Sequence, residues 1–141
     1  MGGMFNGATS ATPNTTYWNT SLVTNMQSVF NSAILANPDV HLWNTSSVTN
    51  MYGMFYLASN ANPDTSSWNF ANVTNMDGML SGTSFTTANY DILLNRIAAT
   101  SIQTGVLLNV GSTPFSSAGL SSWNFLVTTN GWAITDGGGP P

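Results

Sequence analysis

The stretch WNTSSVTNM, residues 43–51, occurs three times with little change in this 141-residue chain. WNTSLVTNM precedes it at residues 18–26 and WNFANVTNM follows it at residues 68–76, so Trp, Val, Asn and Met return every 25 residues. Fixed periods of 20 to 50 residues are typical of proteins built from stacked structural units. The repeat therefore decides the expected fold. We call each 25-residue period a row and each set of equivalent positions a column.

Each row contains a pattern typical of a short helix followed by a short strand. In MYGMFYLA, residues 51–58, the two Met, the Phe and the last Ala have the i, i+3, i+4, i+7 spacing of one helical face. Such a helix should end at a motif like NPD, residues 37–39, because a residue before proline avoids the helical region and Asp favours turns. The β-prone residues 40–43, VHLW, then predict a short strand that ends near the Trp column.

A single row is too small to fold alone. Burying its roughly five apolar side chains contributes about 8–15 kcal/mol, whereas ordering 25 residues costs about 25 kcal/mol or more in backbone entropy. Stacking lets each row bury both its faces and bond to its neighbours. The sequence thus predicts an α/β repeat, a solenoid with a short helix and a short strand in each turn. Inside it, an inward Asn column (Asn25, Asn50 and Asn75) should form a structural ladder.

The C-terminal part is expected to close the stack. Residues 86–99 predict a helix that begins after Thr and carries Tyr, Leu and Ile on one face. GVLLNVG (residues 105–111) predicts a strand, residues 116–131 a second helix that stops at Asn-Gly, and WAIT (residues 132–135) a last strand. These four elements would form a helix-strand-helix-strand cap.

Three segments follow from these expectations. They are a solenoid array of about three and a half rows over residues 1–85, the C-terminal cap over residues 86–136, and a flexible tail or linker over residues 137–141. Met1 already falls in a repeat column, so the array should be uncapped at its N-terminus. We expect an upstream part of a longer chain, or another subunit, to supply the row above.

The stretch WNTSSVTNMYGMF, residues 43–55, resembles the repeat of the BspA-like leucine-rich repeat surface proteins, which runs roughly MFxxAxxFNxDISxWDTSNVTNM. The resemblance covers residues 1–85, and the remainder looks like the segment that closes such arrays. It implies a leucine-rich-repeat-like solenoid on an extracellular surface. Two columns depart from the family pattern, with Ala for Phe after the helix and Asn for Asp after the Trp. The second departure argues against a calcium role for that column.

The composition excludes several classes of partner. Charged residues make up 4% of the chain, against a usual ~25%. One Arg and no Lys cannot neutralise the phosphates of a nucleic acid or an anionic membrane surface. No apolar run approaches the ~20 residues of a membrane span, so membrane insertion is not expected. The 18 Asn, 19 Thr and 17 Ser instead suit turns, caps and ladders.

No residue pattern predicts catalysis, a cofactor or a metal site. His41 has Asp39 two residues away, but no nucleophile motif accompanies the pair. Asp39, Asp64 and Asn14 could stack as calcium ligands, although residues that close a turn after proline are the simpler interpretation. The Trp column is expected to pack between rows rather than to form a sugar-binding strip. We therefore predict a protein that is not an enzyme.

Positions that do not repeat are the best candidates for partner contacts. They are His41, Leu42, Tyr52, Tyr56 and Phe70, with Trp43 as a further aromatic candidate. We interpret the protein as a surface-displayed module for adhesion or recognition of a protein or glycan surface, on a cell envelope or a virion. Low charge favours an alternative, a homo-oligomeric building block that stacks into a fibre, tail or virion surface. A regular Thr column (Thr24, Thr49 and Thr74) leaves ice binding as a second alternative.

Overall fold

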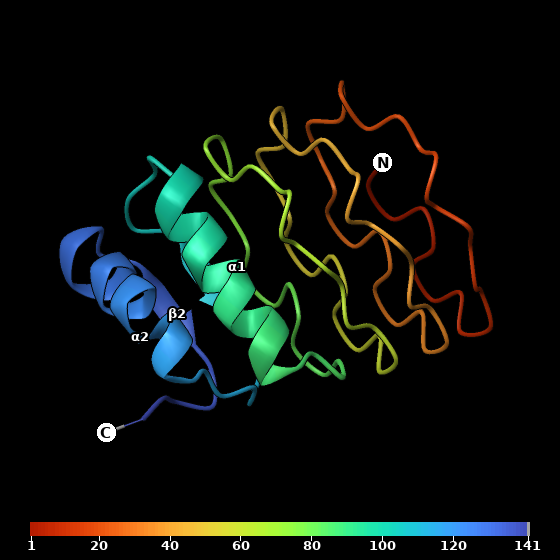
Figure 1. Ribbon diagram of the computed structural model, residues 1–141. Helices are drawn as coiled ribbons and strands as arrows, with labels where there is room; N and C mark the ends of the chain where they lie inside the picture. Colours follow the sequence, from red (N-terminus) through yellow and green to blue (C-terminus); the bar gives the residue numbers. More distant parts are fainter. Residues whose placement is uncertain (141) are drawn as a thin grey trace.

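The computed structural model describes residues 1–140, and its helices and strands all lie after residue 86 (Figure 1). In chain order they are α1 (Thr87–Thr100), β1 (Leu107–Asn109), α2 (Ser117–Asn124), the π-helical turn η1 (Phe125–Thr129) and β2 (Ala133–Thr135). β1 and β2 form a two-stranded parallel sheet in which Leu108 lies opposite Ile134.

The predicted α/β solenoid, with a helix and a strand in every turn and a C-terminal cap, is wrong. Residues 1–86 contain neither a helix nor a strand, and the described chain has only two α-helices, one π-helical turn and two three-residue strands. The N-terminal rows are successive turns, joined by isolated parallel bridges between Asn25, Asn50 and Asn75. Figure 1 shows these coils side by side, with α1 and α2 at one end.

Backbone hydrogen bonds explain why the helical spacing produces no helix. Alternate amides donate to the next row, as Met26 N does to Asn50 O at 2.9 Å and Phe30 N does to Met54 O at 2.8 Å. The amides between them close turns within the row, as Ala33 N does to Phe30 O at 3.0 Å. A helix would direct all its amides along its own axis. Neighbouring rows in fixed register offer every second amide another partner, so stacking overrides the local preference.

Left-handed backbone positions also exclude a helix from the rows. Gly53 has a φ of 56° and Ser28, one row earlier in the same column, has a φ of 54°. Leu57 and Gly82 share a second column, with φ values of 57° and 77°. A residue with positive φ interrupts a right-handed helix. The two columns consist of Gly3, Ser28, Gly53 and Gly78, and of Gly7, Ser32, Leu57 and Gly82.

The strands expected before each Trp are absent because turns occupy these segments. The Asp64 carboxylate accepts the amide N–H two residues further on at 2.9 Å, and Trp68 N then donates to Thr65 O at 3.0 Å. Asn14 and Asp39 make the equivalent side-chain bond in the preceding rows. The interpretation of these three residues as turn-closing residues after proline is therefore confirmed.

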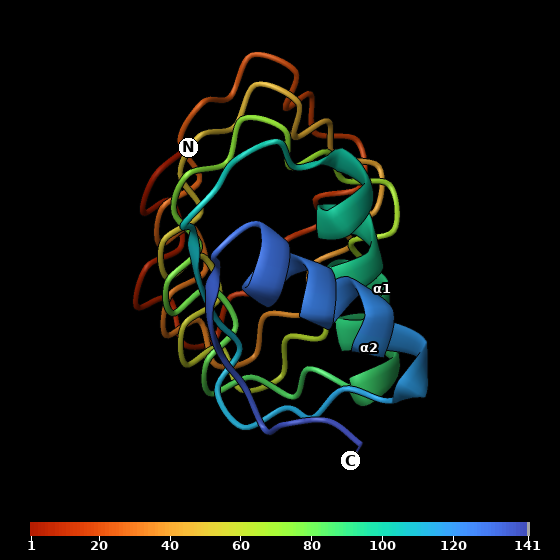
Figure 2. The same ribbon diagram turned by 90° about the vertical axis from the view of Figure 1, so that its left-hand side faces the viewer.

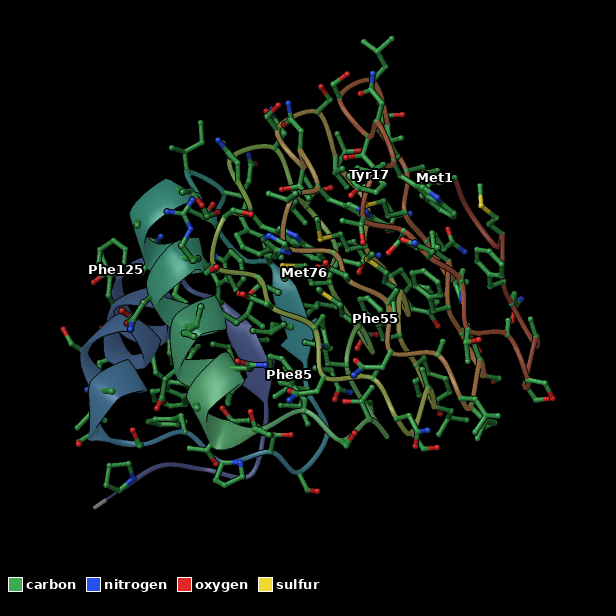
Figure 3. The ribbon with its side chains drawn as sticks, turned by 45° about the vertical axis from the view of Figure 1, so that its right-hand side comes forward. Met1, Tyr17, Phe55, Met76, Phe85 and Phe125 are labelled. Atoms are coloured by element: carbon green, nitrogen blue, oxygen red, sulfur yellow. The ribbon has the colours of Figure 1, made fainter. Side chains whose placement is uncertain are left out.

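Two aromatic stacks run through the core of the rows. Phe5, Phe30 and Phe55 stack with successive ring centroids 5.5 and 5.3 Å apart, and Trp18 stacks on Trp43 at 5.8 Å. Figure 3 shows Phe55 within the layer of side chains between the coils. Trp43 and Phe55 are buried, and the Trp43 ring N–H donates to the backbone carbonyl of Thr15 in the preceding row at 3.2 Å. Packing between rows, as expected of the Trp column, is confirmed for Trp43.

Helix α1 lies against the last row and α2 is fastened to α1. Thr86 caps the N-terminus of α1 by accepting an amide N–H of the first turn at 3.3 Å. Arg96 on α1 donates two hydrogen bonds to Trp68 O, at 2.8 and 3.2 Å. The buried Asp91 accepts both the amide and the hydroxyl of Ser116, at 2.9 and 2.6 Å. The only cationic side chain is thus used inside the structure.

Candidate functional site

One side of the stack is free of helices. In Figure 2 the turns of the rows and the segments that carry β1 and β2 lie on one side, and α1 lies on the opposite side. β1 continues the register of the rows, because Met76 forms a parallel bridge with Leu108 and its N–H donates to Leu107 O at 3.0 Å. Side chains that point outward from successive rows therefore lie next to one another on this side.

A groove of about 320 Å³ opens here, across three rows and β1. Its size lies at the lower end of the ~300–1,000 Å³ range of small-molecule sites. Parallel register between rows brings its lining residues together although they are 78 positions apart in sequence at most. They are Asn31, Tyr52, Gly53, Tyr56, Asp77, Gly78 and Asn109.

Tyr52 and Tyr56 form the aromatic part of the groove. Their side chains are 44% and 40% exposed. The only tyrosine hydroxyl with a hydrogen-bond partner in the described chain is that of Tyr90, so both groove phenols remain available to a ligand. The columns of Tyr52 and Tyr56 hold no aromatic residue in any other row. Packing of the rows therefore does not require these two rings.

Two amide side chains add hydrogen-bond donors. Asn31 Oδ1 accepts the Ser32 hydroxyl at 2.8 Å, and Asn109 Oδ1 accepts the Gly111 amide at 2.9 Å. Within residues 1–140 neither Nδ2 atom has a partner, so both amide groups have N–H donors to offer. The Asp77 carboxylate, which accepts no hydrogen bond from the described residues, supplies acceptors.

Gly53 and Gly78 give the groove its depth. Both have left-handed backbone, with φ values of 56° and 64°. A Cβ on Gly53 would lie 3.6 Å from Asn31 Nδ2, and a Cβ on Gly78 would lie 3.5 Å from Tyr56 Cδ2. Side chains at these positions would fill the space between the lining residues. The column of Gly53 and Gly78 thus forms a turn in each row and, because these two residues have no side chains, leaves the groove open.

A second hollow of about 330 Å³ continues along the same columns toward the first row. Gln27 belongs to the column of Tyr52, and Asn6 belongs to the column of Tyr56. Asn50 Nδ2 donates to Gln27 Oε1 at 3.2 Å across the rows. We call the two hollows together the strip. The second hollow is lined by Gly2, Gly3, Asn6, Asn25, Gln27 and Ser28.

The strip carries very little charge. Asp77 is the only acidic residue that lines either hollow, and no Arg or His lines them. The guanidinium of Arg96, a residue of α1, is held by its hydrogen bonds to Trp68 O in the rows. The groove therefore offers aromatic faces, amide donors, phenol hydroxyls and a carboxylate, but no cationic side chain for an anionic ligand.

The structure separates the six predicted contact residues into three groups. Tyr52 and Tyr56 lie together in the groove. His41 and Leu42 are outside it, and Leu42 is 63% exposed. Trp43 and Phe70 are buried, so the prediction that they contact a partner is wrong. Phe70 fills the space beside Trp68, with ring centroids 6.1 Å apart, because both side chains point into the core.

His41 pairs with Asp39 at the surface. His41 Nδ1 lies 2.5 Å from Asp39 Oδ1, and this hydrogen bond is the main cause that lowers the pKa of the Asp39 carboxyl below its ordinary value. The amide of His41 also donates to the same carboxylate oxygen. The pair therefore closes the turn after proline. The Thr16 hydroxyl donates to the other Asp39 carboxylate oxygen at 3.4 Å, and among the described residues no hydroxyl group bonds to the His41 ring.

The predicted inward ladder of Asn25, Asn50 and Asn75 is wrong in its direction. These side chains are exposed or half-buried, and each Oδ1 accepts the amide two residues further on, at 2.8, 2.9 and 3.0 Å. An Asn side chain commonly makes this local bond, which competes with bonds between rows. The backbone of the column joins neighbouring rows through parallel bridges, and one side chain, that of Asn50, adds a bond across the rows to Gln27 Oε1.

Residues 1–140 contain no group of three or more His, Cys, Asp or Glu placed to hold a metal ion. None of the helices in this range is long and apolar enough to cross a membrane.

Sequence reasoning missed Asn31, Asp77 and Asn109. Their signal was present in the columns, because Asp77 replaces Tyr52 one row later and Asn31 precedes Tyr56 by one row. Asn109 lies outside the 25-residue register, so only the pairing of β1 with the fourth row brings it to the groove. Gly53, which follows Tyr52, and Gly78, which follows Asp77, were a further signal for a left-handed column.

Residues 1–101 match the family described as "Mycoplasma protein of unknown function, DUF285". The chain belongs to this family. The matched range includes all the rows and α1, and therefore most of the residues that line the groove. Neither the curated proteins nor the solved structures gave a match to the chain.

Proposed function

We propose that this protein is a surface-displayed recognition module that binds an extracellular partner through the strip. The observation that carries the proposal is the pair of exposed tyrosines, Tyr52 and Tyr56, beside amide groups with unused donors. Large exposed aromatic side chains gathered in a hollow are typical of binding sites rather than of an ordinary surface. Row packing has no need of them.

The extracellular location, on a cell envelope or a virion, rests on sequence relationships. Residues 43–55 resemble the repeat of BspA-like surface proteins, and the family that matches the chain is associated with such proteins. Low charge and many neutral hydrogen-bonding residues suit contacts that do not depend on ion pairing. These features support display on a surface, where weak contacts repeated over many copies add together.

The lining of the groove favours binding over catalysis. Hydrolysis of glycosidic bonds generally uses two carboxyl groups on either side of the bond, and Asp77 is the only carboxylate that lines the groove. Covalent catalysis requires a nucleophile next to an oriented base. The ionisable groups of the groove are Asp77 and the two phenols, which do not form such a unit.

Adhesion of protein-coated beads tests the function. Beads that carry the full chain are applied to surfaces coated with matrix glycoproteins, mucins or cell-wall polysaccharides, and their retention under flow is measured against albumin-coated beads. We expect retention on at least one of these surfaces. Equal retention of both kinds of bead on every surface would contradict the proposal. Fibres of the purified chain, seen by electron microscopy together with that result, would favour a structural building block.

A further inference from the structure

We propose that the strip binds a neutral oligosaccharide whose chain lies across the rows, with Tyr52 and Tyr56 against its sugar rings. This inference rests on the proposed recognition function and names the chemistry of its ligand. Three properties of the strip carry it: its combination of aromatic and amide groups, its lack of cationic side chains, and its continuation over several rows.

The chemical groups of the groove match those of a sugar. A sugar ring has an apolar C–H face and a rim of hydroxyl groups that both donate and accept hydrogen bonds. Tyr52 and Tyr56 supply aromatic faces. Asn31 Nδ2 and Asn109 Nδ2 supply donors, and the Asp77 carboxylate supplies acceptors for two hydroxyl protons. All these groups are already in place, so little side-chain ordering is required on binding.

The charge of the groove selects against acidic ligands. Recognition of a phosphate or carboxylate normally uses Arg, Lys or a cluster of backbone amides. No cationic side chain lines either hollow, and Asp77 would repel an anion at the centre of the groove. A neutral sugar meets no such penalty, whereas uronic acids, sialic acid and phosphorylated glycans do.

The extent of the strip indicates a chain rather than a single ring. From Asn31 to Asn109 the groove crosses three intervals between neighbouring layers, which corresponds to about 14 Å at ~4.8 Å per interval. The second hollow lies on the same columns and begins in the row of Asn31, which also contains its lining residues Gln27 and Ser28. A ligand that runs along the stack would therefore meet equivalent positions in successive rows.

The first experiment measures binding of neutral oligosaccharides by calorimetry. The probes contain two to six units of glucose, mannose, galactose or N-acetylglucosamine, and polygalacturonate and sialylated oligosaccharides serve as acidic comparisons. We expect at least one neutral series to bind, with affinity that increases with chain length, and the acidic probes to bind more weakly. Failure of every neutral probe, or preference for the acidic ones, would overturn the inference. An affinity independent of length would also overturn it.

The second experiment locates the site by substitution. Tyr56→Ala and Tyr52→Ala should each weaken binding at least about fivefold, which is usual for a truncated aromatic contact. Asp77→Asn should alter the preference among sugars while it preserves the shape of the groove. Tyr17→Ala is the matched control, because Tyr17 (labelled in Figure 3) is 90% exposed and lines neither hollow. Equal affinities of the Tyr56 and Tyr17 variants would refute the placement of the ligand.

The two proposals fail in different ways. Coated beads could be retained on a protein-coated surface equally well after Tyr56→Ala and after removal of glycans from that surface. This result would preserve the recognition function and overturn the sugar inference. If beads that carry the unchanged chain are retained no better than albumin-coated beads on any surface, the recognition function itself is contradicted. Thermal denaturation of each variant confirms that it is folded, which we expect since both tyrosines are substantially exposed.

Discussion

Replacement of Ser28 by glycine should stabilise this protein, although the same change in a helix would destabilise it. Ser28 has a φ of 54°, in the left-handed region that L-residues avoid. Its amide donates to Tyr52 O in the next row, and that bond remains in a Ser28→Gly variant because it uses only the backbone. Two residues in the same column, Gly53 and Gly78, are already glycine with similar φ values.

The expected magnitude follows from two opposing terms. A left-handed conformation costs an L-residue about 1–2 kcal/mol, which glycine avoids. Glycine also increases the conformational freedom of the unfolded chain, which costs about 0.4–1 kcal/mol. The difference leaves Ser28→Gly more stable by about 0.5–1 kcal/mol. In a helix the sign reverses, because glycine is among the poorest helix formers and serine is better by roughly 0.5 kcal/mol.

Equilibrium unfolding in guanidinium chloride measures this difference as a shift in the midpoint. Ser46→Gly is the matched control, since Ser46 is half-buried and does not have a positive φ. We expect the midpoint to rise for the Ser28 variant and to fall for the Ser46 variant. A fall of similar size in both variants would refute the argument from backbone conformation.

Three other perturbations test the core, the helix contact and a turn. Phe55→Ala should cost about 3–5 kcal/mol of unfolding free energy, because Phe55 is fully buried. Phe5 is partly exposed, so Phe5→Ala should cost clearly less. Equal losses for the two variants in a denaturant titration would contradict the stacking. Gly→Ala usually stabilises a helix, but Gly119→Ala should lower the thermal midpoint, because the added Cβ would lie 2.5 Å from Asp91 Oδ1. A rise in the midpoint would argue against this close contact. Hydrogen bonds from the amide and the hydroxyl of Ser66 lower the pKa of the Asp64 carboxyl. The stability that this carboxylate contributes is therefore complete above the ordinary carboxyl pKa and is lost as the pH falls through the lowered value. An NMR titration that gives Asp64 an ordinary pKa would exclude these bonds.

Some elements were predictable because their signals are local. The helix expected over residues 86–99 lies at Thr87–Thr100, since its cap and its apolar face belong to one segment. The turn-closing roles of Asp39 and Asp64 depend on bonds to residues two positions away. The expected helix in each row failed for the opposite reason. Its apolar spacing suits a helix, but every second amide bonds to a residue 24 positions further on.

The candidate site was predictable only in part. The absence of repetition singled out Tyr52 and Tyr56, which do lie together, but the same reasoning singled out Phe70, which is buried. Trp43, chosen as an aromatic candidate from a repeating column, is buried as well. A non-repeating aromatic residue can fill a local space in the core as well as face solvent. The sequence does not distinguish these directions, because the rows are turns without the fixed side-chain periodicity of a helix or a strand.

The sequence by itself determined the 25-residue period, the apolar columns, the low charge and the turn-closing residues after proline. Each of these depends on residue type and spacing alone. The tertiary structure decided that the rows are turns instead of helices, that the Asn side chains face outward, and that residues from three rows and β1 enclose one groove. These features depend on hydrogen bonds between rows. Such bonds form only when segments distant in the sequence are in register, so the sequence of a single row does not predict them.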